Sequence, residues 1–132
     1  MAPNRRGATA RLAFDSGVLI GIERNDRDAF GWLEKAIEDE TDALVSAAAL
    51  AEVWREPARL RLVRALRACV VEPVDQELAR AAGAAIGATG ASLGDALIAT
   101  SAARAGATLV TADHQDMEVL TTHFRSLRLA SL

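Results

Sequence analysis

Acidic side chains that can do chemistry stand at the ends of predicted strands and helices in this sequence. Asp15 and Asp113 each follow a short apolar run, and Asp95 opens a predicted helix. Glu52 lies among alanine, leucine and valine, where a carboxylate costs free energy unless something pairs with it. Because open sheets of parallel strands bind their ligands at the carboxyl edge, we expect these acids to form one site.

Clustered carboxylates are the ligands that hard divalent cations prefer. Mg²⁺ and Mn²⁺ bind oxygen atoms, keep several waters and complete their shell with substrate phosphate. Such a cation makes hydroxide available for in-line attack on phosphorus, and a second cation about 4 Å away stabilises the leaving oxygen. This chemistry needs no catalytic histidine, serine or cysteine. The acids therefore predict a Mg²⁺- or Mn²⁺-dependent site that acts on phosphate esters.

Each acid also has a purely structural interpretation. Asp15 and Asp113 can cap the helices that follow them, Asp95 can be the acid of a capping box, and Glu52 can pair with a nearby arginine. The sequence leaves these alternatives open for each residue taken singly. Three of them, Asp15, Asp95 and Asp113, lie where a parallel sheet gathers its site, and this shared position favours a common site. Glu52 is the exception, and its apolar neighbours are the argument for a partner such as a metal.

Short apolar strands alternate with helices along the whole chain. Strands are predicted at 10–14, 43–46, 69–71, 108–111 and 127–129, and helices at 18–24, 28–39, around Glu52 and Trp54, from Pro57 to Arg67, from Asp75 to Ile86, from Ser92 to Ala105 and at 117–120. Residues Gly87 to Gly90 are predicted to form a loop. This alternation predicts an α/β fold with parallel strands.

The stretch from Ser92 to Asp116 is the most informative part of the sequence, because it predicts a helix, a turn and a buried strand with acids at their ends. Ser92 is a good N-cap and Gly106 a good helix end. Residues 108–111 (TLVT) lack polar alternation, as expected of a strand buried on both faces. One acid therefore opens the helix, and one or two more follow the strand.

Composition indicates one soluble globular domain of 132 residues with a net charge of −3. No apolar run is long enough to cross a membrane, and no apolar segment follows the charged N-terminus as in a signal peptide. A cytoplasmic location is expected. The one cysteine, Cys69, lies in an apolar run and is interpreted as a buried hydrophobe rather than a nucleophile. Residues 1–9 are interpreted as a flexible lead-in to a domain spanning residues 10–132.

A negative net charge argues against nucleic acid as a partner, unless several acids belong to one metal site. Five arginines follow Glu52: Arg55, Arg59, Arg61, Arg64 and Arg67. They can guide an RNA backbone, or they can form a solvated helix face with ion pairs to Glu56 and other acids. Aromatic residues make up only 4% of the chain, so a stacking platform for bases is thin.

Three segments in the right order and spacing resemble a PIN domain, in particular the VapC toxins of bacterial toxin–antitoxin pairs. They are FDSGVLIGIER, SAAALAEVWRE and LGDALIATSAARAGATLVTADHQDM, and the resemblance runs from about Arg11 to Leu129. It implies a central parallel sheet of about five strands flanked by helices. It also implies that Asp15, Glu52, Asp95 and Asp113 are the metal-binding acids, with Asp116 as a further carboxylate in some members. Ser16 and Thr111 match small hydroxyl positions beside the site.

The resemblance further implies endonucleolytic cleavage of RNA that depends on Mg²⁺ or Mn²⁺ and leaves 5′-phosphate ends. It implies a cognate VapB-like antitoxin that covers the site, and a toxin homodimer. Two alternatives remain: a PIN nuclease that processes RNA outside a toxin–antitoxin pair, and a PIN-like module that binds without cutting. Intact acids at all four positions argue against the second alternative.

Overall fold

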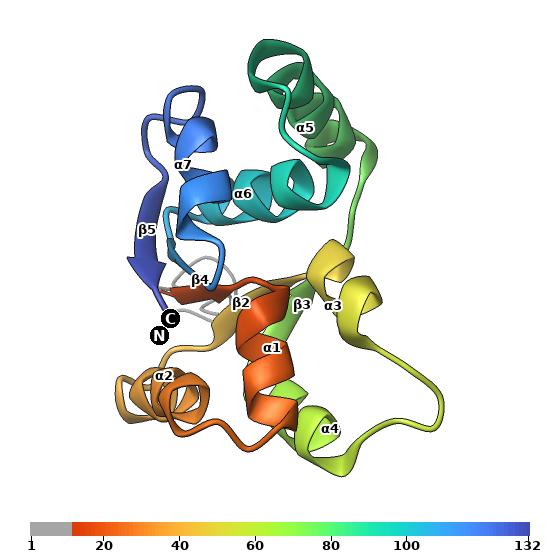
Figure 1. Cartoon of the computed structure of the whole chain (residues 1–132), viewed down its shortest axis with the longest axis vertical. Coiled ribbons are helices and arrows are strands. Elements are labelled where there is room, and N and C mark those ends of the chain that lie inside the picture. Colours follow the sequence, from red (N-terminus) through yellow and green to blue (C-terminus); the bar gives the residue numbers. More distant parts are fainter. Residues whose placement is uncertain (1–11) are drawn as a thin grey trace, which may run out of the picture.

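Five short parallel strands form one sheet in the order β3-β2-β1-β4-β5 (Figure 1). The computed structural model describes residues 12–132, with strands β1 (Leu12–Phe14), β2 (Ala43–Ser46), β3 (Cys69–Glu72), β4 (Thr108–Thr111) and β5 (Arg128–Ser131). The chain runs from β1 outward through β2 to β3 and then crosses to β4 on the other side of β1. The strand order therefore reverses between β1 and β4, which is where open α/β sheets bind their ligands.

Helices cover both faces of this sheet (Figure 1). On one side lie α1 (Ser16–Glu23), α2 (Arg27–Glu38) and α4 (Leu60–Leu66), and on the other lie α5 (Gln76–Thr89), α6 (Leu93–Ala105) and α7 (His114–Thr121). Helix α3 (Ala47–Val53) follows β2 without a break and contacts both α1 and α6. The predicted α/β fold with a five-stranded parallel sheet is confirmed.

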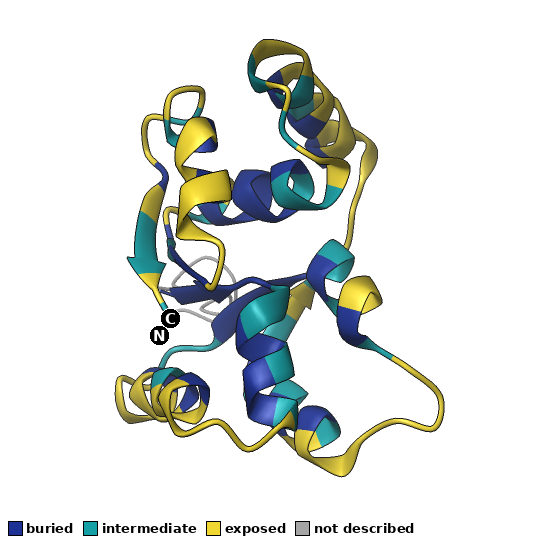
Figure 2. Ribbon diagram, in the orientation of Figure 1, coloured by how far each residue is buried: buried dark blue, intermediate teal, exposed yellow. Residues whose placement is uncertain are grey.

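The three central strands carry the core. Every residue of β1 and β2 is buried, and so are the last three residues of β4 (Figure 2). Strands β3 and β5 form the edges and are partly exposed. The absence of polar alternation in the central strands thus has a simple cause, since helices cover both of their faces.

Polar side chains and glycines set the helix ends as the sequence predicts. Asp75 Oδ1 accepts a hydrogen bond from Leu78 N (2.8 Å) and begins α5, while Ser92 Oγ accepts from Asp95 N (3.2 Å) and begins α6. Gly90 and Gly106 adopt left-handed conformations (φ 75° and 67°) at the C-terminal ends of α5 and α6. The predicted helix from Ser92 to Gly106 is therefore confirmed in its bounds.

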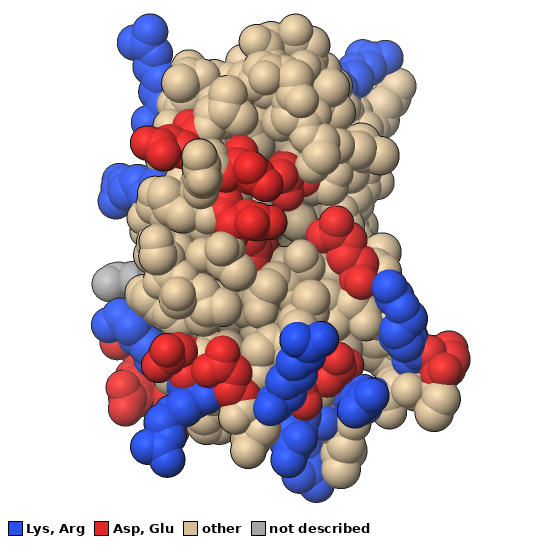
Figure 3. Space-filling view, in the orientation of Figure 1, with Lys and Arg blue, Asp and Glu red and all other residues tan. Residues whose placement is uncertain are grey.

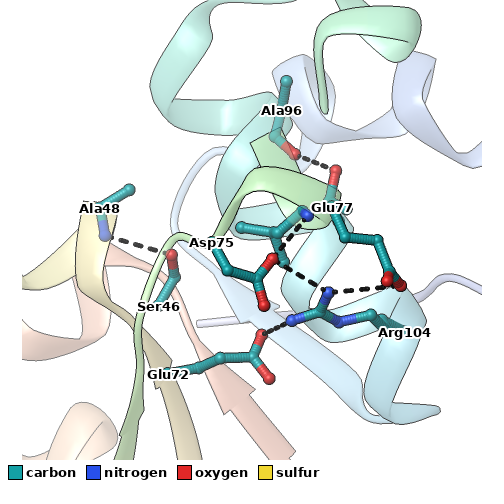
Figure 4. A network of polar contacts seen from close by, with 9 residues as sticks. Ser46, Ala48, Glu72, Asp75, Glu77, Ala96 and Arg104 are labelled. Carbon is teal, nitrogen blue, oxygen red and sulfur yellow. Dashed lines mark hydrogen bonds and ion pairs between the residues drawn. The ribbon is translucent and has the colours of Figure 1, made fainter. Parts of the chain in front are cut away.

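Arg104 of α6 forms ion pairs with acids at the end of β3 and the beginning of α5. Arg104 lies 3.4 Å from Glu72, 3.6 Å from Asp75 and 4.0 Å from Glu77, measured between guanidinium nitrogens and carboxylate oxygens (Figure 4). The Leu78 N–H and, after it, the Arg104 guanidinium lower the pKa of Asp75. This network fixes the connection between β3 and α5 against the helix that carries Asp95.

Two local predictions were wrong. Residues 87–89 continue α5 rather than forming a loop, because the alanine-rich run sustains the helix until Gly90 ends it. Pro57 lies before α4 rather than in its first turn, since Arg59 is extended (φ −80°, ψ 132°) and the helix begins at Leu60. The residue before a proline disfavours helical geometry, which agrees with this break. Trp54 caps α3 instead of belonging to it.

The predicted lead-in of residues 1–9 lies outside the described residues, as do residues 10 and 11 of the predicted first strand. No single helix among residues 12–132 has the length and apolar composition to cross a membrane. Helices α5 and α6 reach that length only together, and they are bent by 119° at the turn between them.

Candidate metal centre

Asp15 is built into the reversal point of the sheet. Its backbone N–H donates to Val110 O (3.1 Å), which extends the pairing of β1 with β4. Its Oδ1 accepts from Gly17 N (2.9 Å) and Val18 N (3.4 Å), so the side chain caps α1. Only 4% of the residue is exposed, and burial raises the pKa of its carboxyl against the opposing effect of these hydrogen bonds.

Thr111 connects Asp15 to the last acidic segment. Its hydroxyl donates to Asp15 Oδ2 and accepts from Asp113 N (2.9 Å). The threonine is 1% exposed, so this hydroxyl joins the ends of β1 and β4 inside the protein. The small hydroxyl position that the sequence singles out is thus a bridge between two of the predicted site residues.

Asp95 lies in the first turn of α6, half-buried, and faces other carboxylates. Burial raises the pKa of its carboxyl most, and the charges of Asp113, Asp116 and Glu52 raise it further, while the Ser92 hydroxyl lowers it. Asp95 therefore lies within electrostatic reach of three acids that come from α3 and from the start of α7. Each of these like charges makes the ionised form of Asp95 less favourable.

Glu52 reaches this cluster from α3. A Cβ added to Gly94 would lie 2.7 Å from Oε2 of Glu52, so the carboxylate packs directly on the residue before Asp95. The argument that its apolar neighbours bury Glu52 is wrong, because the side chain is exposed. Alanine, leucine and valine pack on the other faces of this short helix. The glutamate is nevertheless held beside Asp95.

Asp113 and Asp116 are exposed residues at the beginning of α7. Asp113 occupies the N-cap position but its side chain makes no capping hydrogen bond. The interpretation of Asp113 as a simple helix cap is therefore wrong, and its carboxylate remains available. Asp15, in contrast, does cap α1 and still presents its second oxygen to Thr111.

The PIN domain family matches residues 12–119 of the chain. The chain belongs to the PIN domain family. PIN domains form a family of nucleases, and membership supports a role as a hydrolase acting on RNA. The predicted resemblance, drawn from three sequence segments, is confirmed by this match and by the fold.

Two solved structures share the fold of this PIN domain. One is the crystal structure of VapBC2 from Rickettsia felis bound to a DNA fragment from their promoter, with a TM-score of 0.71 and 17% identity, covering 91% of this chain and 97% of that one. The other is a toxin–antitoxin complex from Klebsiella pneumoniae, with a TM-score of 0.67 and 21% identity, covering 88% and 94%. No curated protein matches the chain by sequence.

Figure 3 shows how the acids of the PIN domain gather. A group of Asp and Glu side chains lies in the middle of the visible face, between the half that contains α6 and α7 and the half that contains α1 and α3. Within residues 12–132, however, no three acidic, histidine or cysteine side chains converge closely enough to hold a metal ion as they stand. Asp95 lies within electrostatic reach of Glu52, Asp113 and Asp116, and these three are exposed side chains that can rotate.

Sequence reasoning missed two glycines that shape this site. A Cβ at Gly17 would lie 2.6 Å from Ala112 Cβ and 3.2 Å from Asp15 Oδ1, so α1 approaches the end of β4 as closely as a glycine permits. Gly94 provides the same closeness for Glu52. No local sequence signal distinguishes these glycines from others, because the demand arises from a neighbouring segment.

The other residues that the sequence singled out lie outside the acid cluster. The five arginines after Glu52 make no ion pair with any described residue; they are Arg55, Arg59, Arg61, Arg64 and Arg67. Glu56, the expected partner, instead accepts a hydrogen bond from Trp54 Nε1 (2.5 Å). His114 Nδ1 lies 3.0 Å from Ser131 Oγ. Burial raises the pKa of the Cys69 thiol to about 12, which suits a packed hydrophobe and not a nucleophile.

Proposed function

We propose that this PIN domain is a Mg²⁺- or Mn²⁺-dependent endoribonuclease and the toxin of a toxin–antitoxin pair. One observation carries the proposal: a half-buried Asp95 lies in the field of three further carboxylates, and one of these, Asp113, is linked through Thr111 to a buried Asp15 at the reversal point of the sheet. Like charges in such a position destabilise one another unless a cation joins them. The family match supports the nuclease part of the proposal.

The donor set fits a hard divalent cation. Asp15, Glu52, Asp95, Asp113 and Asp116 offer only carboxylate oxygens, which Mg²⁺ and Mn²⁺ prefer. A cation removes the electrostatic cost that raises the pKa of Asp95. When bound, such a cation activates water and neutralises charge on phosphate oxygens. Exposed Glu52, Asp113 and Asp116 would rotate toward it, whereas Asp15 is already oriented.

The protein's own groups prepare this site. Backbone N–H groups of Gly17 and Val18 hold one oxygen of Asp15, and the Thr111 hydroxyl holds the other. Thr111 also accepts from Asp113 N, so α7 begins at a fixed place relative to Asp15. The negative field repels an RNA backbone, and a bound cation reverses that field locally. The same acids that would hold the cation would therefore make RNA binding depend on it.

A second surface suits a protein partner. Ile22, Leu33 and the exposed Phe30 and Ile37 line a hollow of about 390 Å³ between α2 and α4, and Arg61 and Arg64 border it. Exposed apolar surface with a charged rim is typical of a protein interaction site. The names of both similar structures describe toxin–antitoxin assemblies, which supports a VapB-like antitoxin as the occupant.

Cleavage of purified RNA tests the nuclease. The protein, freed of any antitoxin, is incubated with total RNA in Mg²⁺ or Mn²⁺, and in EDTA. Discrete fragments with 5′-phosphate ends are expected only with the cation. The Asp95→Asn variant should be inactive, while Asp39→Asn, which neutralises an exposed aspartate at the end of α2, should cleave like wild type. A folded wild-type protein that cuts no RNA in either cation would contradict the proposal.

Expression in cells tests the toxin. We expect induction of the wild-type chain to arrest growth and Asp95→Asn to be harmless at equal protein levels. Co-expression of a cognate VapB-like antitoxin should restore growth. Normal growth despite measurable RNA cleavage would favour an RNA-processing nuclease instead. A homodimer and a cytoplasmic location are parts of the same proposal, and light scattering of the purified chain tests the first.

A further inference from the structure

A hollow of about 440 Å³ lies beside the acids. Asp95 and Asp116 line one part of it, and the turn between α5 and α6, from Thr89 to Ser92, lines another. Gln115 and Val119 on α7 complete the lining. Its size falls within the range of pockets that hold small organic groups. Whatever enters this hollow lies directly next to the carboxylates proposed to hold the cation.

The lining favours an uncharged ligand. No basic side chain contributes to it, so the hollow itself offers no positive charge to a phosphate, and its two carboxylates are the groups proposed to hold the cation. Val119 is 40% exposed, which is high for a valine, and half-buried Ala91 adds further apolar surface. A flat, neutral group that has apolar faces and a polar edge fits this combination better than an ion does.

Gln115 is the uncommitted polar group of this hollow. The Thr89 hydroxyl is already engaged, because it donates to Ala85 O (2.7 Å) and accepts from Ala91 N (3.2 Å). Ser92 Oγ accepts from Asp95 N (3.2 Å). The exposed Gln115 amide, in contrast, makes no hydrogen bond with any residue of the described part. An amide offers a donor and an acceptor side by side, which is the pattern that base edges display.

The frame of the hollow is fixed before any ligand arrives. Gly90 takes a left-handed conformation (φ 75°), and the two Thr89 hydrogen bonds hold the turn on both sides of it. Gln115 and Asp116 both lie in the first turn of α7, so the helix backbone fixes the points from which the amide and a site carboxylate extend. A group bound at Gln115 is thereby placed relative to the acids.

We propose that this hollow binds one unpaired nucleobase of the RNA substrate, adjacent to the bond that is cut, and that Gln115 reads its edge. The proposal rests on the nuclease function proposed above and names how that site selects its substrate. Single-stranded RNA can turn a base out of its stack, and proteins recognise such bases by hydrogen bonds and apolar contact. A phosphate would lie at the cation on the acids, and the hollow beside it, which has no basic side chain, is left to the base.

Abasic scanning tests this pocket. Short RNAs that carry the preferred cleavage sequence receive a single abasic residue at each position in turn, and kcat/KM is measured for wild type and Gln115→Ala. At one position next to the cut, the abasic residue should reduce wild-type kcat/KM about tenfold, as for one lost hydrogen bond with its apolar contact. In Gln115→Ala the same abasic residue should cost less than about threefold, because the contact is already missing.

Gln76→Ala is the matched control. Gln76 is the first residue of α5, and Thr89 is its last, so the two ends of this helix are about 20 Å apart at 1.5 Å per residue. This variant should show the wild-type abasic profile. Equal profiles for wild type and Gln115→Ala would overturn the proposal, and so would a wild-type profile without any sensitive position.

A binding measurement separates this proposal from the nuclease itself. RNA with a non-cleavable linkage at the cut and 2-aminopurine at the sensitive position, or at each position in turn, is titrated with wild-type protein in Mg²⁺ and with the Gln115→Ala variant. A fluorescence change that requires Gln115 supports the pocket even if wild type cuts nothing. Cleavage without Gln115-dependent fluorescence overturns the pocket and leaves the nuclease intact. Failure to bind or cut any RNA overturns both.

Discussion

The floor and the rim of the candidate metal centre are built in different ways. The floor, Asp15 and Thr111, is buried, hydrogen-bonded and set by the pairing of β1 with β4. The rim, Glu52, Asp113 and Asp116, is exposed, and none of its carboxylates makes a hydrogen bond with a described residue. Asp95 is half-buried and lies under the influence of the rim charges. The fold thus specifies the floor, and a ligand must order the rim.

This difference predicts the largest effect for the floor. Asp15→Asn keeps one oxygen for the cap of α1 but removes the charge that would bind the cation. Loss of residues that merely support metal ligands typically costs 10- to 100-fold, so we expect RNA cleavage to fall by more than about 100-fold. Melting temperature should change little, because a neutral amide is easier to bury than a carboxylate.

The Asp39→Asn variant serves as the control, since it removes an exposed charge of the same type at the end of α2. It should keep wild-type activity. Cleavage by Asp15→Asn within threefold of wild type would show that the floor carboxylate is not needed.

Thr111→Val tests whether the floor orients its acid through the hydroxyl. The substitution keeps the shape but leaves Asp15 Oδ2 and Asp113 N without their partner. We expect a 10- to 100-fold loss of activity and a loss of about 1–3 kcal/mol in the free energy of unfolding. Thr111→Ser should recover most of both quantities. Equal losses in the serine and valine variants would mean that packing, and not the hydroxyl, matters.

Two glycines sharpen the comparison between floor and rim. Gly94→Ala pushes a Cβ to 2.7 Å from the flexible end of Glu52, which can move away at little cost. We expect RNA cleavage by this variant to fall about tenfold. Its melting temperature should stay within about 2 °C of wild type, which corresponds to a change well below about 1 kcal/mol in the free energy of unfolding. Gly17→Ala meets Ala112 Cβ at 2.6 Å and cannot be relieved so easily.

The Gly17→Ala variant should lose about 1–3 kcal/mol in the free energy of unfolding. Thermal denaturation and RNA cleavage, measured on both alanine variants, distinguish the two effects. A strongly destabilised Gly94→Ala protein would show that the rim is as rigid as the floor.

The smallest expected effect concerns pH and metal. The pKa of Asp95 is raised in the folded protein. As the pH rises above about 4, Asp95 therefore loses its proton in the unfolded chain before it does so in the folded protein. The free energy of unfolding of the metal-free protein consequently falls until the pH has passed the raised pKa. Wild type should therefore lose melting temperature relative to Asp95→Asn over this range. Metal at tenfold its Kd should restore about 1.4 kcal/mol to wild type and little to the variant. A flat difference between the two proteins, with or without Mn²⁺, would contradict this account.

The sequence predicted the floor better than the rim, for a physical reason. Asp15 directly follows β1 and Thr111 ends β4, and the carboxyl edge of a parallel sheet brings such residues together without further information. Glu52 was expected to be buried because its neighbours are apolar, but a short helix can bury those neighbours on one face and expose the glutamate on another. Exposure of a single helical residue depends on which segments pack beside it.

The elements of the fold were also predicted well where the signal is local in sequence and poorly where it is not. Apolar runs and caps predicted the strands and the helix from Ser92 to Gly106, since these signals are local. The end of α5 and the start of α4 were misplaced, because glycines in an alanine-rich helix and a proline before a helix each allow two outcomes. The need for glycine at positions 17 and 94 comes from atoms far away in sequence, and no local pattern reports it.

The hydrogen bond between Thr111 and Asp15 spans 96 residues, and this separation has a consequence for protein synthesis. A ribosome makes Asp15 early and Thr111, Asp113 and Asp116 near the end. A chain interrupted before residue 108 lacks β4, the Thr111 end of the floor contact and two of the three rim carboxylates. On the proposed function, translation products that stop before β4 would not cleave RNA, because the site would be incomplete until residues 108–116 are made.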